Sequence, residues 1–225
     1  MTLTRNEVKR FYDHFGSRQD SQAFYEDAAL HELIAHGDFS HACSIFELGC
    51  GTGRLALRLL QKELPESATY LGSDLSDTML QLSRARLAPF AGRATVLPAG
   101  DKLVFALQDK SVDRVLSCYV LDLMSETDIV QVLREAKRVL VPGGKLCLAS
   151  LTRGVNLPSK IVCGVWRGIF NIRASLVGGC RPISLLDYIA ASDWRVDFRR
   201  IITQFGVPTE LIVATPLPVT ELSRQ

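Results

Sequence analysis

The sequence predicts an α/β protein whose sheet is mostly parallel and lies between two layers of helices. Five short apolar runs alternate with amphipathic stretches between residues 44 and 150, and two strand-like runs near the C-terminus are joined by only four residues. Strands that alternate with helices form parallel sheets covered on both faces. A four-residue connection cannot hold a parallel crossover, so the last two strands should form an antiparallel hairpin. We therefore expect a three-layer α/β/α sandwich with a seven-stranded, mostly parallel sheet and an antiparallel last strand.

The first 42 residues are expected to form two helices. Thr4 and Glu7 have the spacing of a capping box, in which two side chains satisfy N–H groups at the start of a helix. Apolar side chains then recur at helical spacing up to Gly16, which is expected to end this helix. A second helix is expected from about Ser21, because apolar residues again recur three and four positions apart.

The alternating region follows, with its own start and stop signals. Ser76 is a typical N-cap for the helix after the second strand. Acidic residues open the stretch 126–140 and basic residues close it, as the helix dipole favours, and Pro142 with two glycines is expected to stop that helix. The expected strands are residues 44–48, 68–72, 94–97, 112–117, 145–150, 195–205 and 210–215, and the expected helices are residues 54–64, 76–87, 126–140 and 184–191.

Composition and charge limit the class of protein. The chain has 225 residues, of which 47% are hydrophobic and 22% charged, as in ordinary soluble domains. Its 26 basic and 24 acidic side chains give a net charge of +2, which does not favour a nucleic-acid partner. The N-terminus lacks an apolar signal segment, and the longest apolar stretch, residues 161–180, is interrupted by Arg167 and Arg173. We expect a cytoplasmic protein without a membrane span.

The cysteines and histidines do not predict a metal site. None of the six cysteines forms a C-x-x-C pair, and several lie in apolar, strand-like runs, so they are expected to be buried and reduced. The four histidines lie far from any cysteine pair, which disfavours zinc.

The main chemical signal is the glycine-rich segment 47–53, Glu-Leu-Gly-Cys-Gly-Thr-Gly, between an expected strand and an expected helix. Glycines allow a sharp turn and a close approach to a ligand, and the N–H groups at the start of the helix favour a negative group. A nicotinamide-binding G-x-G-x-x-G pattern needs its third glycine at position 54. Arg54 occupies that position, so the pattern disfavours a nicotinamide oxidoreductase.

This segment resembles motif I of class I S-adenosylmethionine (SAM)-dependent methyltransferases, and four further blocks in the expected order extend the resemblance over roughly residues 43–152. The chain is most similar to the small-molecule, ubiquinone-biosynthesis-like branch. The resemblance implies a Rossmann-like core, SAM as cofactor with S-adenosyl-L-homocysteine as product, and no metal. It implies that Asp74 binds the ribose hydroxyls and that Gly100 and Asp101 hold the adenine. The implied cofactor-binding residues are Glu47, Gly49, Cys50, Gly51, Gly53, Asp74, Leu75, Gly100, Asp101 and Ser117.

Two features depart from the family pattern. Arg114 is a polar residue at the start of the fourth strand, where the family usually has an apolar one. The block 102–105, Lys-Leu-Val-Phe, is more apolar than the acidic stretch often found there.

Methyl transfer from a sulfonium is an in-line displacement, so an enzyme must position the acceptor and, where needed, remove its proton. The candidate catalytic residues are Tyr119 and Asp122, after the fourth strand, and His14 in the first helix. Each also has a purely structural interpretation: packing for Tyr119, a helix cap for Asp122 and surface exposure for His14. The candidate substrate-binding residues are Tyr12, Cys118, Trp166 and Arg167.

Residues 153–182 interrupt the alternation and combine apolar with basic side chains. Three interpretations remain open: a pocket wall that selects a hydrophobic acceptor carrying an acid, a peripheral contact with an anionic membrane surface, or packing on the sheet. The expected organisation is a helical lid (1–42), a SAM-binding core (43–152), a substrate-side insertion (153–182) and a C-terminal helix with the closing hairpin (183–225).

The sequence therefore predicts a SAM-dependent methyltransferase whose partner is a small, hydrophobic or lipid-like methyl acceptor. The alternative is a catalytically silent protein of the same fold that serves as a scaffold or partner protein.

Overall fold

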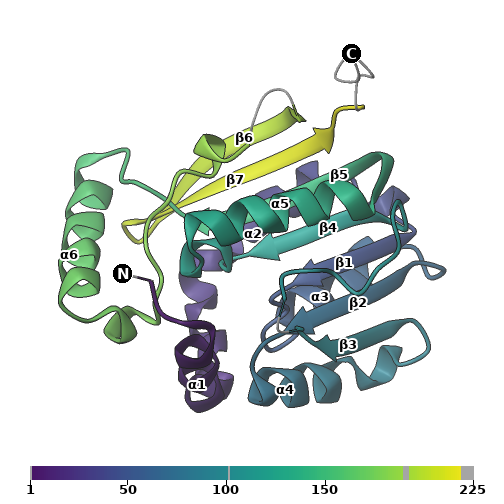
Figure 1. Ribbon diagram of the computed structural model, residues 1–225, viewed down its shortest axis with the longest axis horizontal. Helices are drawn as coiled ribbons and strands as arrows, with labels where there is room; N and C mark the ends of the chain where they lie inside the picture. The colour runs from purple at the N-terminus through teal and green to yellow at the C-terminus, as the bar shows by residue number, and fades with distance from the viewer. Residues whose placement is uncertain (1, 101, 190–192, 219–225) are drawn as a thin grey trace.

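The computed structural model describes residues 2–100, 102–189 and 193–218. Its seven strands form one sheet in the order β3-β2-β1-β4-β5-β7-β6 (Figure 1). The first five strands run parallel, whereas β7 is antiparallel to both β5 and β6. This topology confirms the predicted fold class. The strands are β1 (Ser44–Leu48), β2 (Thr69–Asp74), β3 (Ala94–Pro98), β4 (Val112–Cys118), β5 (Leu140–Leu151), β6 (Trp194–Gln204) and β7 (Val207–Pro216).

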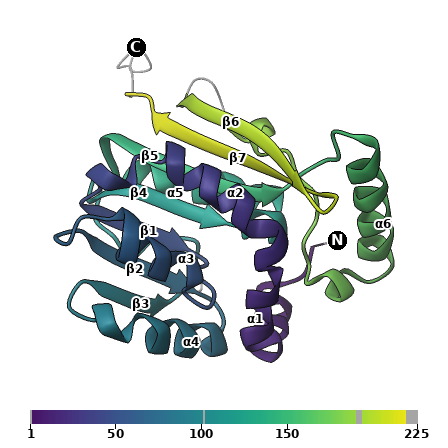
Figure 2. The ribbon, with the colours of Figure 1, turned by 180° about the vertical axis from the view of Figure 1, so that it is seen from behind.

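Helices cover both faces of the sheet and create two apolar cores. One core packs α2, α3 and α4 against side chains such as Ile45 and Leu116, and the other packs α5 and residues 183–189 against side chains such as Phe46 and Val115. Figures 1 and 2 show these two layers from opposite sides. The α-helices are α1 (Arg5–Phe15), α2 (Ala23–His36), α3 (Arg54–Arg58), α4 (Asp77–Leu87), α5 (Glu126–Val139) and α6 (Leu157–Arg173).

The predicted caps form at the predicted places. The Thr4 hydroxyl accepts from the Glu7 N–H, and the Glu7 carboxylate accepts from the Thr4 N–H, which completes the capping box of α1. The Ser76 hydroxyl accepts from the Met79 N–H at the start of α4. Cap bonds of this kind each stabilise a helix by about 0.5–2 kcal/mol.

Three local expectations were wrong. The helix expected over 184–191 is, in its described part, a 3-10 turn at Leu185–Asp187, because Leu185 is buried and donates its N–H to Glu210. The fifth strand is longer than expected, since Leu140 already pairs with Val112 before residues 141–144 leave the ladder. The helix expected over 54–64 changes after Arg58 into a π-helical turn, Leu59–Glu63.

Arg114, the departure at the start of β4, ties α2 to the sheet. Its buried guanidinium donates to the carbonyl oxygens of Gly37 (2.8 Å) and Asp38, just beyond the C-terminal end of α2, and to that of the neighbouring Asp113 in β4. Carbonyl oxygens at a helix C-terminus carry partial negative charge, so a cation here is favourable.

Two helices lie outside the three layers. α1 crosses the end of the sheet where β1 and β2 finish, and α6 stands apart at the left of Figure 1, attached near the turn between β6 and β7. Within the described residues, no helix combines the length and apolar character that crossing a bilayer requires.

Candidate functional site

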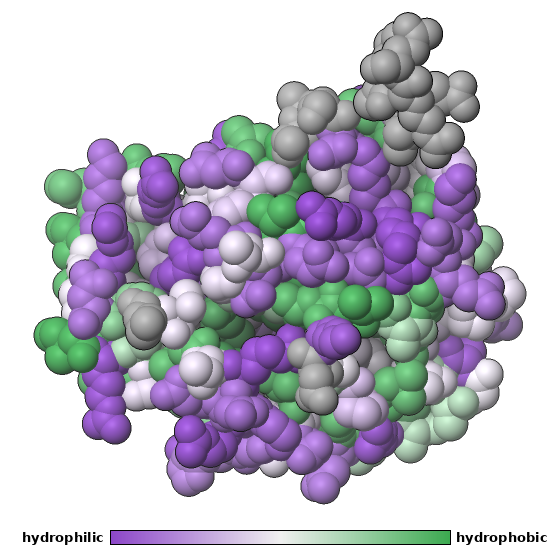
Figure 3. Space-filling view, in the orientation of Figure 1, coloured by the Kyte–Doolittle hydropathy of each residue, from purple (hydrophilic) through white to green (hydrophobic). Residues whose placement is uncertain are grey.

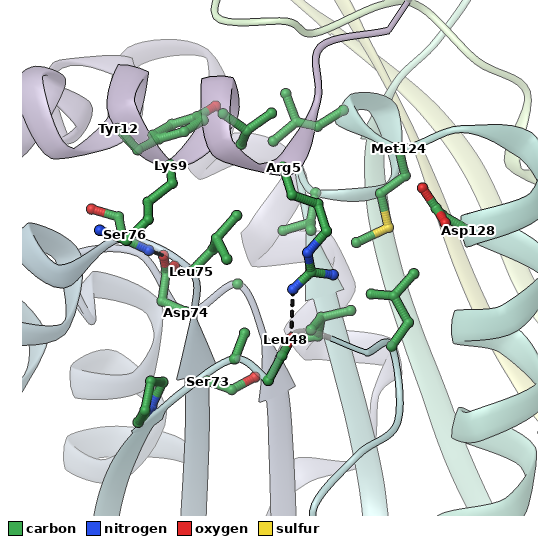
Figure 4. A pocket seen from close by; sticks show the side chains of 18 of the residues that line it. Arg5, Lys9, Tyr12, Leu48, Ser73, Asp74, Leu75, Ser76, Met124 and Asp128 are labelled. Atoms are coloured by element: carbon green, nitrogen blue, oxygen red, sulfur yellow. Dashed lines mark hydrogen bonds between the residues drawn. The ribbon is translucent and has the colours of Figure 1, made fainter.

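A cavity of about 360 Å³ opens at the carboxyl ends of β1, β2 and β4 beneath α1 (Figure 4). Small-molecule sites typically have volumes of about 300–1,000 Å³, and open parallel sheets bind ligands at this edge. The cavity therefore lies at the strand ends, where the glycine-rich sequence indicated a ligand site.

The glycine-rich loop forms one wall. Gly49 and Gly51 line the cavity with φ angles of 75° and 53°, a region that other residues rarely adopt. A Cβ atom on Gly49 would lie 2.2 Å from Cγ2 of Val120, so a side chain cannot be accommodated without movement. The loop is anchored by the Gly49 N–H, which donates to the Ser73 carbonyl at 2.7 Å.

Asp74 lies at the end of β2 and its carboxylate faces this loop. One oxygen accepts from the Gly51 N–H (2.8 Å) and the other from the Ser76 N–H (2.9 Å), which fixes the carboxylate plane beside the cavity. Burial raises the pKa of Asp74, and the backbone N–H groups of Ser76 and Gly51 oppose that shift. Each carboxylate oxygen can accept more than one hydrogen bond, so both can still accept from a diol.

Other predicted cofactor residues lie in and below the cavity wall. Leu75 and Gly100 line the cavity, whereas Glu47 is buried beneath the loop and accepts from the Tyr70 hydroxyl. Burial raises the pKa of Glu47 to about 7. The predicted residues that do not line the cavity are Glu47, Cys50, Gly53 and Ser117, and Asp101 lies outside the described residues.

The apolar block at 102–105 forms part of the opposite wall. Leu103, Val104 and Phe105 line the cavity, and Phe105 packs on Phe46 of β1 with ring centroids 4.7 Å apart. This second departure from the family pattern makes the cavity more apolar on the side of Gly100.

α1 forms the roof, and its contribution was only partly found from sequence. Arg5 and Lys9 point from α1 toward the strand ends, and Tyr12 of the same helix also lines the cavity (Figure 4). Arg5 donates to the Gly100 carbonyl at 2.7 Å, and Lys9 forms a 2.7 Å ion pair with Asp77 of α4. Arg5 and Lys9 were missed. Their i, i+4 spacing with Tyr12 at i+7 was the available signal.

The turn after α1 also contacts the glycine-rich loop. Asp20 accepts from the Thr52 hydroxyl at 2.6 Å and from Arg86 of α4 at 2.6 Å. Gln19 lines the cavity above Gly51, and its Oε1 atom is buried without a hydrogen-bond partner in the described part of the chain. A buried acceptor without a partner is costly, so this atom is suited to contact a ligand.

Arg54 also anchors the N-terminal helices. It begins α3 and donates to Glu26 at 3.0 Å and to Asp27, both on α2. Burial raises the pKa of Glu26 to about 7, although the charge of Arg54 opposes this shift. The residue that disfavours a nicotinamide-binding pattern thus has a structural role.

The end of β4 supplies the acceptor-side candidates. Cys118 and Tyr119 line the cavity, and the Tyr119 hydroxyl lies 3.1 Å from Oγ1 of Thr209. Asp122 is fully buried behind them, and neither carboxylate oxygen has a hydrogen-bond partner among the described residues. Burial raises the pKa of Asp122 to about 7. Tyr12 lines the cavity, and its hydroxyl lies 3.9 Å from Sγ of Cys180.

Three predicted residues lie away from the cavity. His14 is exposed, on a part of α1 that does not line the cavity. Trp166 donates its indole N–H to the Cys180 carbonyl at 2.9 Å, and Arg167 is exposed on α6. Sequence spacing alone could not show which face of α6 would meet the rest of the protein.

Comparisons with known proteins agree with this geometry. The family described as "Methyltransferase domain" matches residues 45–144. A malonyl-[acyl-carrier protein] O-methyltransferase from Marinomonas sp. is 29% identical over 86% of this chain and 67% of its own length. The ubiquinone/menaquinone biosynthesis C-methyltransferase UbiE from Bordetella avium is 28% identical over 66% of this chain and 58% of its own length. This chain thus spans about three fifths to two thirds of these relatives.

Residues 45–144 are similar to methyltransferase domains, and these comparisons support a class I SAM-dependent methyltransferase. The similarity to UbiE supports the ubiquinone-biosynthesis-like branch. A geranyl diphosphate C-methyltransferase from Streptomyces coelicolor, solved with Mg²⁺, geranyl diphosphate and S-adenosyl-L-homocysteine, shares the fold with a TM-score of 0.64 at 15% identity. The two chains align over 85% of this chain and 79% of that one.

The cavity fits the family's cofactor, SAM. The loop at Gly49 and Gly51 leaves room that a Cβ would fill, Asp74 offers two acceptor oxygens, and Gln19 offers a buried acceptor without a partner. The described residues include no group of three or more His, Cys, Asp or Glu side chains arranged to hold a metal ion.

Proposed function

We propose that this protein transfers a methyl group from SAM to a small, hydrophobic or lipid-like molecule. The observation that carries the proposal is the shape and lining of the cavity, which runs from Asp74 past Tyr119 to Met124 and is mainly apolar beyond the glycine-rich loop. The name of the UbiE relative, which refers to ubiquinone and menaquinone biosynthesis, supports an acceptor with an apolar portion.

We propose that the chain holds the cofactor through groups on both sides of the loop. Asp74 accepts hydrogen bonds from the ribose hydroxyls, and the side chains of residues 103–105 provide an apolar wall for the adenine beside Gly100. Gln19 covers the loop from the side of the N-terminal turn. Bound SAM supplies a methyl group that is already activated by the positive charge on sulfur.

The chain's own contribution to the reaction is positioning and exclusion of water. Tyr119 and Cys118 contact the acceptor from the end of β4, and Tyr12 contacts it from the roof. Holding the reacting atoms in line supplies much of the catalysis for such a displacement. The polar contacts of Arg5 and Lys9 keep α1 over the cavity while transfer occurs.

Asp122 is proposed as a positioning residue. It does not line the cavity, but its charge acts on Tyr12 and Cys180, and burial raises the pKa of its carboxyl to about 7. A carboxyl with this pKa can hold or release a proton near neutral pH, which is the range a general acid or base needs. We propose that its charge state influences the Tyr12 hydroxyl, which belongs to a residue that lines the cavity.

The test is methyl transfer from labelled SAM to matched acceptor pairs. Phenols, hydroquinones and carboxylic acids with long alkyl tails are compared with the same compounds without tails. We expect methylation of tailed compounds, and a roughly tenfold lower kcat/KM for Tyr119→Phe because one acceptor contact is lost. Tyr188→Phe, on the opposite side of the sheet, is the control. Methylation of the tailless compounds alone would contradict a hydrophobic acceptor.

A further inference from the structure

α6 is fixed to the rest of the protein by one face. Ser159 and Cys163 are buried, and the Cys163 thiol lies 3.3 Å from the Thr152 carbonyl, to which it can donate. The Trp166 indole donates to the Cys180 carbonyl at 2.9 Å. Cγ2 of Val162 lies 2.9 Å from the point where a Cβ on Gly206, in the β6–β7 turn, would stand. Ser159, Val162, Cys163 and Trp166 thus define the inner face of α6.

The outer face of α6 carries an apolar stripe that no part of the described chain covers. Its members are spaced four, four and seven residues apart, which places them along one side of a helix. They are Leu157 (73% exposed), Ile161 (59%), Val165 (60%) and Ile172 (85%). Soluble proteins rarely leave such a continuous apolar surface uncovered unless it contacts a partner or a membrane.

Basic residues accompany the stripe. Between Thr152 and Leu186 the chain has five basic residues and no acidic one, although the whole chain has nearly equal numbers of each. Lys160 and Arg167 are exposed and seven residues apart, so they lie along the same edge of the stripe. Figure 3 shows hydrophobic side chains at the left margin, where α6 lies, beside a column of hydrophilic ones.

We propose that the outer face of α6 docks on an anionic lipid surface. A helix with an apolar stripe and flanking Lys or Arg lies in the plane of a membrane, with its stripe among the acyl chains and its cations near the headgroups. A second copy of this chain is a poorer occupant, because pairing the stripes would bring two sets of basic side chains together. Seventeen residues extend about 26 Å, enough to lie along the surface.

Docking there would attach the membrane to a helix whose following segment contacts the roof of the cavity. Gly178 and Gly179, just after α6, pack against Phe11 of α1 and against Leu3, which lines the cavity. The inference does not rest on the proposed function, because lipid binding requires neither SAM nor an acceptor.

The test is co-sedimentation of the full chain with vesicles of phosphatidylcholine alone or with added phosphatidylglycerol. We expect binding only to the anionic vesicles, weakened by high salt. Ile161→Asp/Ile172→Asp should lower the partition coefficient by about tenfold or more, since two buried apolar groups are lost. Lys160→Gln/Arg167→Gln should lower it several-fold. Val130→Asp, which changes an exposed apolar residue on α5, is the matched control and should bind as the wild type.

Several outcomes would overturn the proposal. No binding to the anionic vesicles, or wild-type binding by the Ile161→Asp/Ile172→Asp variant, would remove the lipid surface as the partner of the stripe. Equal binding to neutral and anionic vesicles would contradict the part of the proposal that assigns anionic headgroups to the basic residues. A dimer in light scattering that the same variant converts to a monomer would assign the stripe to a second copy. A thermal melt of each variant checks that it is folded, and the Lys160→Gln/Arg167→Gln variant provides a test that leaves the apolar stripe intact.

Discussion

The roof helix α1 and the outlying helix α6 differ in how their side chains are partnered. α1 is fixed over the cavity by directional polar contacts, including Arg5 with the Gly100 carbonyl and Asp13 with the Ser76 hydroxyl at 2.7 Å. α6 is attached by its inner face and presents Ile161 and Ile172 to solvent. Polar contacts within the chain thus fix the position of α1, whereas α6 has an apolar surface that none of the described residues covers.

The largest effect is expected at Gly49, where the cofactor side is tightest. Gly49→Ala places a Cβ 2.2 Å from Val120 at a φ of 75°. Backbone strain of about 1–3 kcal/mol and overpacking of similar size should lower the affinity for S-adenosylhomocysteine by roughly 100-fold or more. Titration calorimetry measures the affinity of each variant for S-adenosylhomocysteine. Gly92→Ala is the control, since nothing lies within 4 Å of its Cβ position. Equal affinities of the two variants for S-adenosylhomocysteine would show that the loop tolerates a Cβ atom at position 49.

Asp122, after β4, contacts the segment that follows α6, because its carbonyl oxygen accepts from the Arg181 N–H at 3.1 Å. Its folded-state pKa of about 7 lies above the ordinary value of 3.8, so the folded protein binds the proton more tightly than the unfolded chain. Stability from this group is therefore full below about pH 4 and is lost as the pH rises toward 7.

Asp122→Asn should remove the loss of folding stability that the wild type shows as the pH rises. We expect the variant to be more stable than the wild type at pH 8, by roughly 1–3 kcal/mol, and to show a smaller difference at pH 4. Thermal melts across this pH range measure the effect. If the wild type were instead more stable than Asp122→Asn at pH 8, the charged carboxylate would stabilise the fold, which would imply a cation as its partner.

Arg54 tests the attachment of α2 to the cofactor loop. Arg54→Ala leaves Glu26 buried without its partner, and we expect a loss of roughly 1–3 kcal/mol in the free energy of unfolding. Arg58→Ala is the matched control, because its pair with Glu63 is longer (3.7 Å) and more exposed and contributes about 0–1 kcal/mol. Denaturant titrations compare the two. Similar losses of unfolding free energy in both variants would mean that burial of Glu26 does not strengthen its ion pair with Arg54.

The smallest effect is expected on α6. Ile172→Ser changes a side chain that is 85% exposed, so the free energy of unfolding should change by no more than about 0.5 kcal/mol. Ile129→Ser in the buried face of α5 should cost several-fold more, about 2–4 kcal/mol. A loss above about 1 kcal/mol for Ile172→Ser would show that the outer face of α6 is covered in the folded protein.

The sequence predicted the sheet and the cofactor loop because their constraints are local. The caps at Thr4 and Ser76 and the positive φ angles at Gly49 and Gly51 are local features, and Asp74 is marked by its position at the end of the second strand. The short connection before β7 likewise predicted its reversal.

The roof and the acceptor side could not be predicted in the same way. Arg5 meets the Gly100 carbonyl across 95 residues of sequence, and Asp20 meets Arg86 across 66, so no local pattern marks either contact. The sequence predicts a helix over 184–191, but in its described part the burial of Leu185 and its bond to Glu210 determine the backbone. Tertiary contacts override weak helix propensity in such short segments.

The most direct test of the central claim is a calorimetric titration of S-adenosylhomocysteine into the wild type and Asp74→Asn. We predict binding at about micromolar concentration and a loss of roughly 10- to 100-fold in the variant, since the amide cannot accept from both ribose hydroxyls. Glu66→Ala, an exposed change before β2, should bind as the wild type. No binding to the wild type, or equal binding by Asp74→Asn, would contradict the assignment of this cavity to the cofactor.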